Sequence, residues 1–171
     1  MTRVALVPGV PALLPAYSSL EDPVAPLRAA CLDAVAWLGP APRVIASAQG
    51  SRVAAALLDE VASEAERRAV DDVAHHPGVL VVGNGSARRT DVSPGPFDPR
   101  ALPFDDALFA ALGGPDPAAL RSLDAALAEE LWADVGCFGE LADLLGGASL
   151  VGVDYDDAPY GVQYWVMRWR A

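Results

Sequence analysis

A short polar turn offers the clearest chemistry in this chain. Residues 83–89 read Gly-Asn-Gly-Ser-Ala-Arg-Arg and follow an apolar run at 79–82 that predicts a buried strand. Two glycines and an asparagine permit a sharp turn whose backbone amides point outward. The guanidinium groups of Arg88 and Arg89 are planar forks of donors, suited to a carboxylate or a phosphate. The turn therefore predicts an anion site at the carboxyl end of a strand, where open α/β sheets bind ligands.

A second turn, at residues 156–161, supplies the other predicted site residues. It contains Asp157 and Tyr160, and the tyrosine can close one wall of a pocket. The predicted ligand-binding residues are Asn84, Ser86, Arg88, Arg89, Asp157 and Tyr160. The competing interpretation is internal pairing: in a chain of net charge −11, the two arginines can pair with nearby acids such as Asp91, Asp98 or Asp157. A buried arginine needs such a partner under either interpretation.

Three carboxylates lie just before and at the start of this second turn: Asp154 in the preceding strand, then Asp156 and Asp157. Oxygen ligands of this kind suit hard cations, but the spacing lacks the rest of a calcium-binding loop. Solvation of the turn and pairing with arginine are the favoured roles.

Strands and helices alternate along the chain and must position these turns. Short apolar runs predict strands at residues 3–7, 43–47, 79–82, 150–155 and 162–166. Apolar spacing and capping residues predict helices at 21–38, 51–61, 63–75, 104–112, 117–122, 125–133 and 138–145, with Ser51, Asp116 and Asp124 as caps. The last two strands are close enough in sequence for an antiparallel hairpin. The fold class is therefore α/β: a single domain over residues 1–171, with a mixed, mostly parallel sheet flanked by helices and a C-terminal β-hairpin.

Residues 90–103 contain four prolines and a glycine. Proline removes an amide donor and restricts the residue before it, so no long helix is expected here. The segment predicts a long ordered loop or a flexible lid, and long loops in compact domains are often functional.

Composition excludes several classes of function. A net charge of −11 and a pI of about 4.4 oppose binding to nucleic acid. The chain contains no lysine, which excludes Schiff-base chemistry and a phosphate-loop lysine. It has no Gly-x-Ser-x-Gly motif, no hydrolase triad and no full dinucleotide-binding pattern. No apolar run is long enough for a membrane span and no secretory signal is evident, so no membrane partner and a cytoplasmic location are expected. Cys31 and Cys137 are expected to be buried free thiols.

An ordered set of motifs resembles one family, and the match covers roughly residues 79–169. The motifs are residues 83–89, Pro94-Gly95, Phe97-Asp98-Pro99-Arg100, Phe104-Asp105, Leu123-Asp124 and Tyr155-Asp156-Asp157-Ala158-Pro159-Tyr160-Gly161. Together they look like the small actinobacterial proteins classed with the class III extradiol ring-cleavage dioxygenases, in the LigB-like superfamily.

The resemblance implies an Fe(II) cofactor, held in active members by two histidines and a glutamate. The first histidine would lie in the loop at 8–12, the second near 47–49, and a third, acting as acid and base, at Ala87; none of these positions holds histidine. Alanine neither transfers protons nor binds metal. His75 and His76 point about 100° apart on a predicted helix, so a role at the helix C-terminus is favoured over metal binding. No cofactor and no catalytic residue are therefore predicted.

These observations lead to three hypotheses. The first is a LigB-like protein without the iron site, a pseudoenzyme that binds a small anionic or aromatic ligand, or a protein partner, at the 84–89 turn. The alternative is a metal-dependent ring-cleaving dioxygenase or related oxidoreductase whose ligands are non-standard or come from a partner subunit. The third is a structural subunit or homo-oligomer, with Leu13, Leu14 and Trp165 at a dimer surface.

Overall fold

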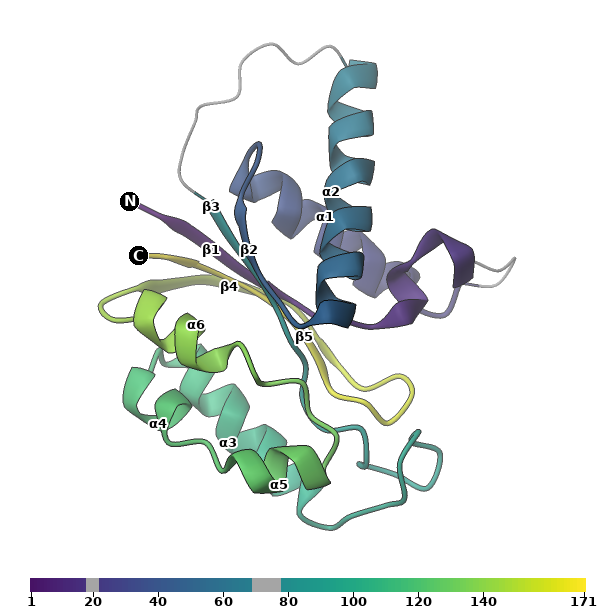
Figure 1. The fold of residues 1–171 in the computed structure, drawn as a ribbon, viewed down its shortest axis with the longest axis vertical. Helices are drawn as coiled ribbons and strands as arrows, with labels where there is room; N and C mark the ends of the chain where they lie inside the picture. Colours follow the sequence, from purple (N-terminus) through teal and green to yellow (C-terminus); the bar gives the residue numbers. More distant parts are fainter. Residues whose placement is uncertain (18–21, 69–77) are drawn as a thin grey trace.

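The computed structural model describes residues 1–17, 22–68 and 78–171. These residues form a five-stranded sheet in the order β2-β3-β1-β5-β4, with helices on both faces (Figure 1). The strands are β1 (Arg3–Val7), β2 (Arg43–Ile45), β3 (Gly78–Val82), β4 (Ser149–Asp157) and β5 (Tyr164–Arg170). The α-helices are α1 (Ala25–Leu38), α2 (Ala48–Arg68), α3 (Ala101–Gly113), α4 (Pro117–Arg121), α5 (Ala125–Glu130) and α6 (Phe138–Leu144), and two 3-10 turns, Pro11–Leu13 and Pro15–Tyr17, precede α1.

The sheet confirms the predicted α/β class. Strands β1, β2 and β3 are parallel, whereas β5 runs antiparallel to β1 and forms an antiparallel hairpin with β4. The apolar sequences of β1 and β3 bury every residue after the first, as expected for strands covered on both faces. Their register runs from Arg3 opposite Gly78 to Val7 opposite Val82. The carboxyl ends of β1 and β3 therefore lie side by side, and β3 leads directly into the 84–89 turn.

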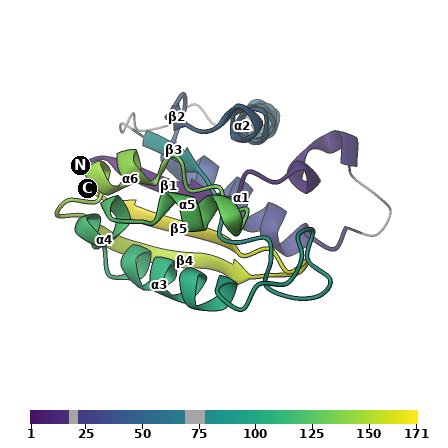
Figure 2. The same ribbon diagram turned by 60° about the horizontal axis from the view of Figure 1, so that its bottom comes forward.

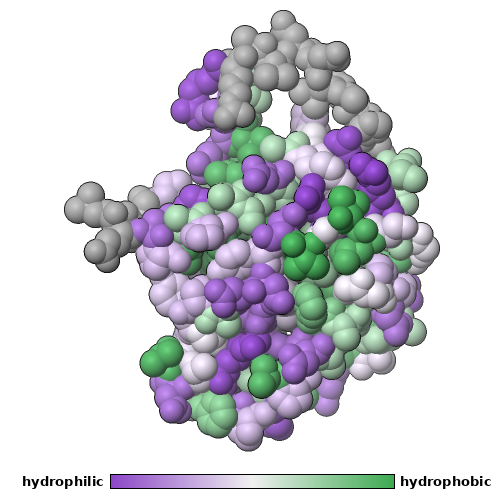
Figure 3. Space-filling view, turned by 180° about the vertical axis from the view of Figure 1, so that it is seen from behind, coloured by the Kyte–Doolittle hydropathy of each residue, from purple (hydrophilic) through white to green (hydrophobic). Residues whose placement is uncertain are grey.

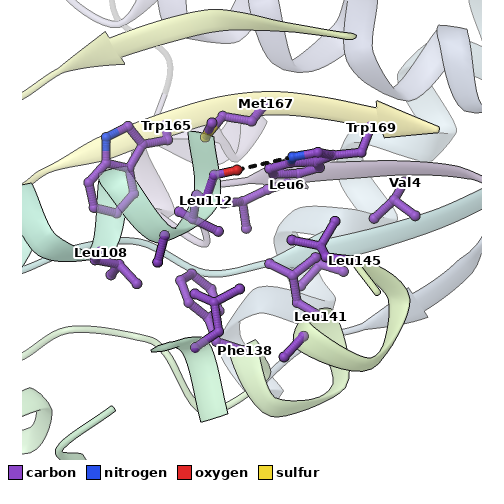
Figure 4. Packing of buried hydrophobic residues seen from close by; sticks show 14 of the residues in the cluster. Val4, Leu6, Leu108, Leu112, Phe138, Leu141, Leu145, Trp165, Met167 and Trp169 are labelled. Atoms are coloured by element: carbon purple, nitrogen blue, oxygen red, sulfur yellow. Dashed lines mark hydrogen bonds between the residues drawn. The ribbon is translucent and has the colours of Figure 1, made fainter. Parts of the chain in front are cut away.

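Alternating side chains of the sheet enter two separate cores. Helices α1 and α2 cover one face and α3 to α6 cover the other (Figure 2). Along β1, for example, Ala5 and Val7 face α1, while Val4 and Leu6 face the opposite core. Figure 4 shows that opposite core, where side chains of β5 pack between α3 and α6. There the indole N–H of Trp169 donates to the carbonyl oxygen of Leu112 at 3.2 Å.

Helix α2 differs from its prediction. The sequence predicted two helices, at 51–61 and 63–75, but a single helix runs from Ala48 to Arg68. Ser47 occupies the cap position in place of Ser51: the Gly50 N–H donates to Ser47 Oγ at 3.1 Å, and the Ser51 hydroxyl donates to the Ser47 carbonyl at 2.9 Å. Serine at position 63 lies on the exposed side, where it interrupts no packing. The rest of the prediction, residues 69–75 with His75, and the neighbouring His76 lie outside the described residues.

Other predictions are confirmed or need smaller corrections. Asp116 caps α4 through the N–H groups of residues 118 and 119, and Asp124 caps α5 through that of residue 127, as predicted. Cys31 is a buried free thiol, whereas Cys137 is partly exposed because it precedes α6 near the surface.

Two of the three residues suggested for a dimer surface, Leu13 and Trp165, belong to the core instead. Leu13 and Trp165 are each 1% exposed and belong to the two cores, and Leu14 packs partly buried against the core beneath α1. The face seen in Figure 3 is mainly polar, with groups of hydrophobic side chains lying between polar ones. Across the described ranges, no helix combines the length and the hydrophobicity that crossing a membrane requires.

Candidate functional site at the carboxyl edge of the sheet

The 84–89 turn is anchored by backbone hydrogen bonds on two sides. The N–H of Gly85 donates to the Gln163 carbonyl at 3.0 Å, and the N–H of Gln163 donates to the Ser86 carbonyl at 3.0 Å. On the other side the N–H of Ala87 donates to the Leu131 carbonyl at 2.9 Å. The turn is therefore fixed between the residues preceding β5 and the end of α5, and residues 83–87 are buried.

Ser86 is fully buried and bound to a carboxylate that the sequence analysis did not pair with it. Its N–H donates to Asp105 Oδ1 at 2.8 Å, and its hydroxyl donates to Asp105 Oδ2 at 2.6 Å. Arg89 Nη1 donates to the same Oδ2 at 3.1 Å and also to Gln163 Oε1. Because both donors of Ser86 are engaged by Asp105, this serine positions the carboxylate from α3 and has no donor left for a ligand.

Burial dominates the electrostatics of Asp105. The carboxylate is 1% exposed, and desolvation raises its pKa above the ordinary value. Hydrogen bonds from Ser86 and the positive charge of Arg89 act in the opposite direction. The group thus depends on these two partners for its ionised form.

Arg89 is held at one end and free along one edge. Nη1 makes both of its side-chain contacts, whereas Nε and Nη2 have no hydrogen-bond partner among the residues that the structure describes. The side chain is 19% exposed. Among the described residues, Trp165 Nε1 is the one side-chain nitrogen or oxygen that is both buried and without a hydrogen-bond partner. Because Nε and Nη2 of Arg89 also have no partner in this set, they are not buried, and solvent reaches them.

Arg88 is used internally. Nε donates to the Pro96 carbonyl at 2.7 Å, and Nη1 donates to the Glu130 carbonyl at 2.6 Å. The carboxylate of Asp98 lies 3.7 Å from Nη1 but binds Arg100 more closely, at 2.7 Å and 3.0 Å. Arg88 therefore ties the loop before α3 to α5.

The predicted partners of the arginines need correction. Of Asp91, Asp98 and Asp157, only Asp98 approaches either arginine, and Arg89 pairs with Asp105 instead. Arg89 and Asp105 are 16 positions apart, and they meet because α3 packs against the turn. A local sequence pattern could not predict this contact.

The loop predicted at 90–103 ends at residue 100, because α3 begins at Ala101, and it is fastened to the turn. The N–H of Gly95 donates to the Ala87 carbonyl at 3.1 Å, and that of Asp98 donates to the Arg88 carbonyl at 2.9 Å. Ser93 Oγ donates to the Gly161 carbonyl at 2.9 Å. These bonds hold both predicted turns and the loop against one another.

The residues of the second turn lie near the surface. Tyr160 is 38% exposed, and its neighbour Gly161 accepts a hydrogen bond from the Arg89 N–H at 3.4 Å. Asp157 is exposed and accepts from the Ala158 N–H at 2.7 Å. The favoured arginine pairing is confirmed for Asp154, whose carboxylate binds Arg168 at 2.6 Å and 2.7 Å.

A second polar group lies where β1, β2 and β3 end; it includes the predicted Asn84, but the sequence analysis did not name its carboxylate, Asp134. Asn84 and Asp134 form an antiparallel bridge, with N–O distances of 3.0 Å and 3.1 Å. Ser47 Oγ donates to Asp134 Oδ2 at 3.1 Å, and Gln49 Nε2 donates to the Gly9 carbonyl at 2.9 Å. We call Gly9, Ser47, Gln49, Asn84 and Asp134 the switch-point cluster, because they lie where the connections after the neighbouring strands β1 and β3 leave for opposite faces of the sheet. Asp134 lies between two helices without a motif, so only the fold reveals it.

The switch-point cluster does not fit an Fe(II) site of two histidines and one carboxylate. It offers one carboxylate, and its other side-chain groups are a hydroxyl and two amides, which are poor substitutes for imidazole at iron. Ala87, where the resemblance would require an acid and base, is packed in the core beneath α1 and α2. Across residues 1–17, 22–68 and 78–171, no three His, Cys, Asp or Glu side chains gather in a metal-binding arrangement.

A recess of about 530 Å³ between α1 and the β4–β5 hairpin includes none of the predicted site residues. It is lined by Pro26, Ala30, Asp33, Asp154 and Arg168.

The comparisons with known proteins add no assignment: no protein-family model matches the chain, and no curated protein matches it.

Proposed function

We propose that this chain is a LigB-like α/β domain that lacks ring-cleaving chemistry and binds a small anionic ligand beside the 84–89 turn. The family assignment rests on the ordered motifs over residues 79–169, and the lack of iron chemistry rests on the donor set of the switch-point cluster. The single observation that carries the binding proposal is the free edge of Arg89.

The geometry of Arg89 suits a carboxylate or phosphate oxygen pair. Its Nε–H and one N–H of Nη2 point in the same direction, which is the arrangement that forms two parallel bonds to an anion. Asp105 and Gln163 already fix the guanidinium through Nη1, so little side-chain freedom remains to be lost on binding. Because most of this side chain is buried, the edge favours a small ligand over a broad protein surface.

The proposal is tested by following the Nε–H resonances of the arginines in two-dimensional NMR spectra. Inorganic phosphate and 3,4-dihydroxybenzoate are the probes, the second combining a carboxylate with an aromatic ring. We expect the Arg89 Nε–H signal to shift saturably. Arg89→Lys, followed through the backbone N–H signals of residues 88 and 89, should weaken binding by about tenfold or more, because lysine cannot form the paired bonds. Arg121→Lys, at an exposed ion pair with Asp143, is the matched control.

Two results would contradict the proposal. Equal, unsaturable shifts of the Arg89 and Arg121 signals would show general ion association. Turnover of 3,4-dihydroxybenzoate after addition of Fe(II), with stoichiometric iron retained by the purified protein, would support the ring-cleaving alternative instead.

A further inference from the structure

The sheet has a topological switch point between β1 and β3. These neighbouring strands are parallel, but the chain leaves β1 for α1 on one face and leaves β3 for α3 on the other (Figures 1 and 2). Connections that part in this way open a crevice outside the carboxyl ends of the strands, where α/β sheets bind ligands. The switch-point cluster occupies this position.

Backbone pairing directs two of its side chains to the same place. Asn84 and Asp134 exchange both of their hydrogen bonds, so they are directly opposite each other. Side chains of such a pair lie on one face, with Cβ atoms about 5 Å apart. A Cβ atom placed on Gly9 would lie 3.5 Å from Asp134 Oδ2 and 3.0 Å from a Val82 methyl group. The loops after all three parallel strands thus approach the Asp134 carboxylate.

Within this cluster each side-chain donor group makes one hydrogen bond, whereas three side-chain oxygens accept none from the described residues. The hydroxyl of Ser47 binds Asp134, and the amide nitrogens of Gln49 and Asn84 bind the carbonyls of Gly9 and Gly85. Asp134 Oδ1, Asn84 Oδ1 and Gln49 Oε1 accept no hydrogen bond from the described residues. No described arginine forms an ion pair with Asp134 either.

The oxygen of Asn84 is the most informative of the three. The residue is 7% exposed, and an amide buried to this degree normally has its oxygen bonded. Within the described ranges this oxygen has no partner, and Trp165 Nε1 is the only unpartnered side-chain nitrogen or oxygen that is fully buried. The Asn84 oxygen therefore keeps some contact with solvent. It is therefore an acceptor in a recessed position that a small donor can reach.

We infer that the switch-point cluster binds a primary ammonium group of a small molecule. An ammonium group has three N–H donors and no acceptor, equal in number to the three free oxygens, and Asp134 supplies the opposite charge. A divalent cation is a poorer match, because the site contains one carboxylate and Mg²⁺ or Ca²⁺ sites of this size commonly use more. This site does not involve Arg89, so it stands or fails independently of the anion site.

Ethanolamine is the probe, followed by backbone and side-chain amide spectra. We expect saturable shifts of the Gly9 N–H and the Asn84 side-chain NH₂ signals. Asp134→Asn should weaken binding by about tenfold or more, because it removes a charge-assisted bond. Asp106→Asn, an exposed acid on α3, should leave it unchanged. If Asp134→Asn lowers the melting temperature so far that the protein is unfolded, the exposed Gln49→Ala replaces it, with an expected loss of several-fold.

Three outcomes would overturn the inference. Equal shifts with tetramethylammonium, which has no N–H donor, would indicate only the attraction of a chain of net charge −11. Displacement of ethanolamine by stoichiometric Mg²⁺ at these resonances would indicate a metal site. Unchanged affinity in both folded variants, Asp134→Asn and Gln49→Ala, would place the amine elsewhere.

Discussion

Ser86 and Asp105 meet through two hydrogen bonds, from the serine N–H to Oδ1 at 2.8 Å and from its hydroxyl to Oδ2 at 2.6 Å. One side chain of α3 thereby fixes both the backbone and the side chain of a turn that lies 19 positions earlier. Arg89 binds the same carboxylate, so the three residues form a buried, charge-assisted group at the edge of the sheet.

Removing this carboxylate should destabilise the protein strongly. Asp105→Ala leaves the Ser86 N–H and Arg89 Nη1 without a principal acceptor, and we expect a loss of roughly 3 kcal/mol in the free energy of unfolding. Ser86→Ala removes only the hydroxyl bond and should cost about 1–2 kcal/mol. Urea titration of both variants and of the double variant measures the effect. Because the two residues share one interaction, the double variant should lose clearly less free energy of unfolding than the sum of the two single losses. Strictly additive losses would contradict the pairing.

The ion pair of Asp98 should make stability depend on pH in the acid range. Hydrogen bonds from Arg100, together with its charge, lower the pKa of Asp98 from 3.8 to about 2. Because the folded-state pKa lies below the unfolded value, the stabilisation is complete above about pH 5 and is lost as the pH falls towards 2. Asp98→Asn should therefore melt below the wild type near neutrality, and the gap should narrow as the pH falls. Melting curves across this range test it, and a constant gap would refute it.

Gly85 should not tolerate a side chain. A Cβ atom there would lie 2.5 Å from Asp105 Oδ1 and 2.8 Å from Trp165 Cη2. Gly85→Ala should therefore lose about 1–3 kcal/mol through overpacking. Gly139, within α6, has nothing within 4 Å of such an atom, and Gly139→Ala should gain about 0.5–1 kcal/mol. Denaturant midpoints of the two variants should move in opposite directions, and a shift in the same direction would contradict this account.

Ala41 should be improved by glycine. It lies in the turn between α1 and β2 with φ of 53°, in the left-handed region that alanine disfavours. Relief of this strain exceeds the added chain entropy of glycine, so Ala41→Gly should stabilise the protein by about 0.5 kcal/mol. The control is Ala107→Gly on the exposed side of α3, which should destabilise by about 1 kcal/mol. Thermal melts compare the two, and a lower melting temperature for Ala41→Gly would be the contrary result.

The elements that sequence predicted well have strong local patterns. Strand β1 and its partner β3 follow from short apolar runs, and α4 and α5 follow from Asp116 and Asp124 as caps. Helix α2 was divided because Ser63 resembles a cap when only local sequence is considered. Helix interiors tolerate such a serine on an exposed face, so local chemistry alone could not decide its role.

The site was predicted less completely because its contacts are long-range. Residues 84–89 do lie at the carboxyl edge of the sheet, but most are buried, which the turn composition could not reveal. The roles of Asp105 and Asp134 follow only from the fold, in which α3 and the segment before α6 pack against the turn. Sequence identified which segment is polar, whereas the fold decided which of its groups are already bonded.

The sheet order has a consequence for the order of assembly. Strand β1 lies between β3 and β5, so the strand at residues 3–7 gains its second neighbour only from residues 164–170. During synthesis, one edge of β1 must wait until more than 150 further residues have emerged. Pairing over such a separation slows folding and leaves a strand edge exposed to unwanted association in the meantime. The sheet is therefore complete only once β5, paired with β4, has added to the free edge of β1.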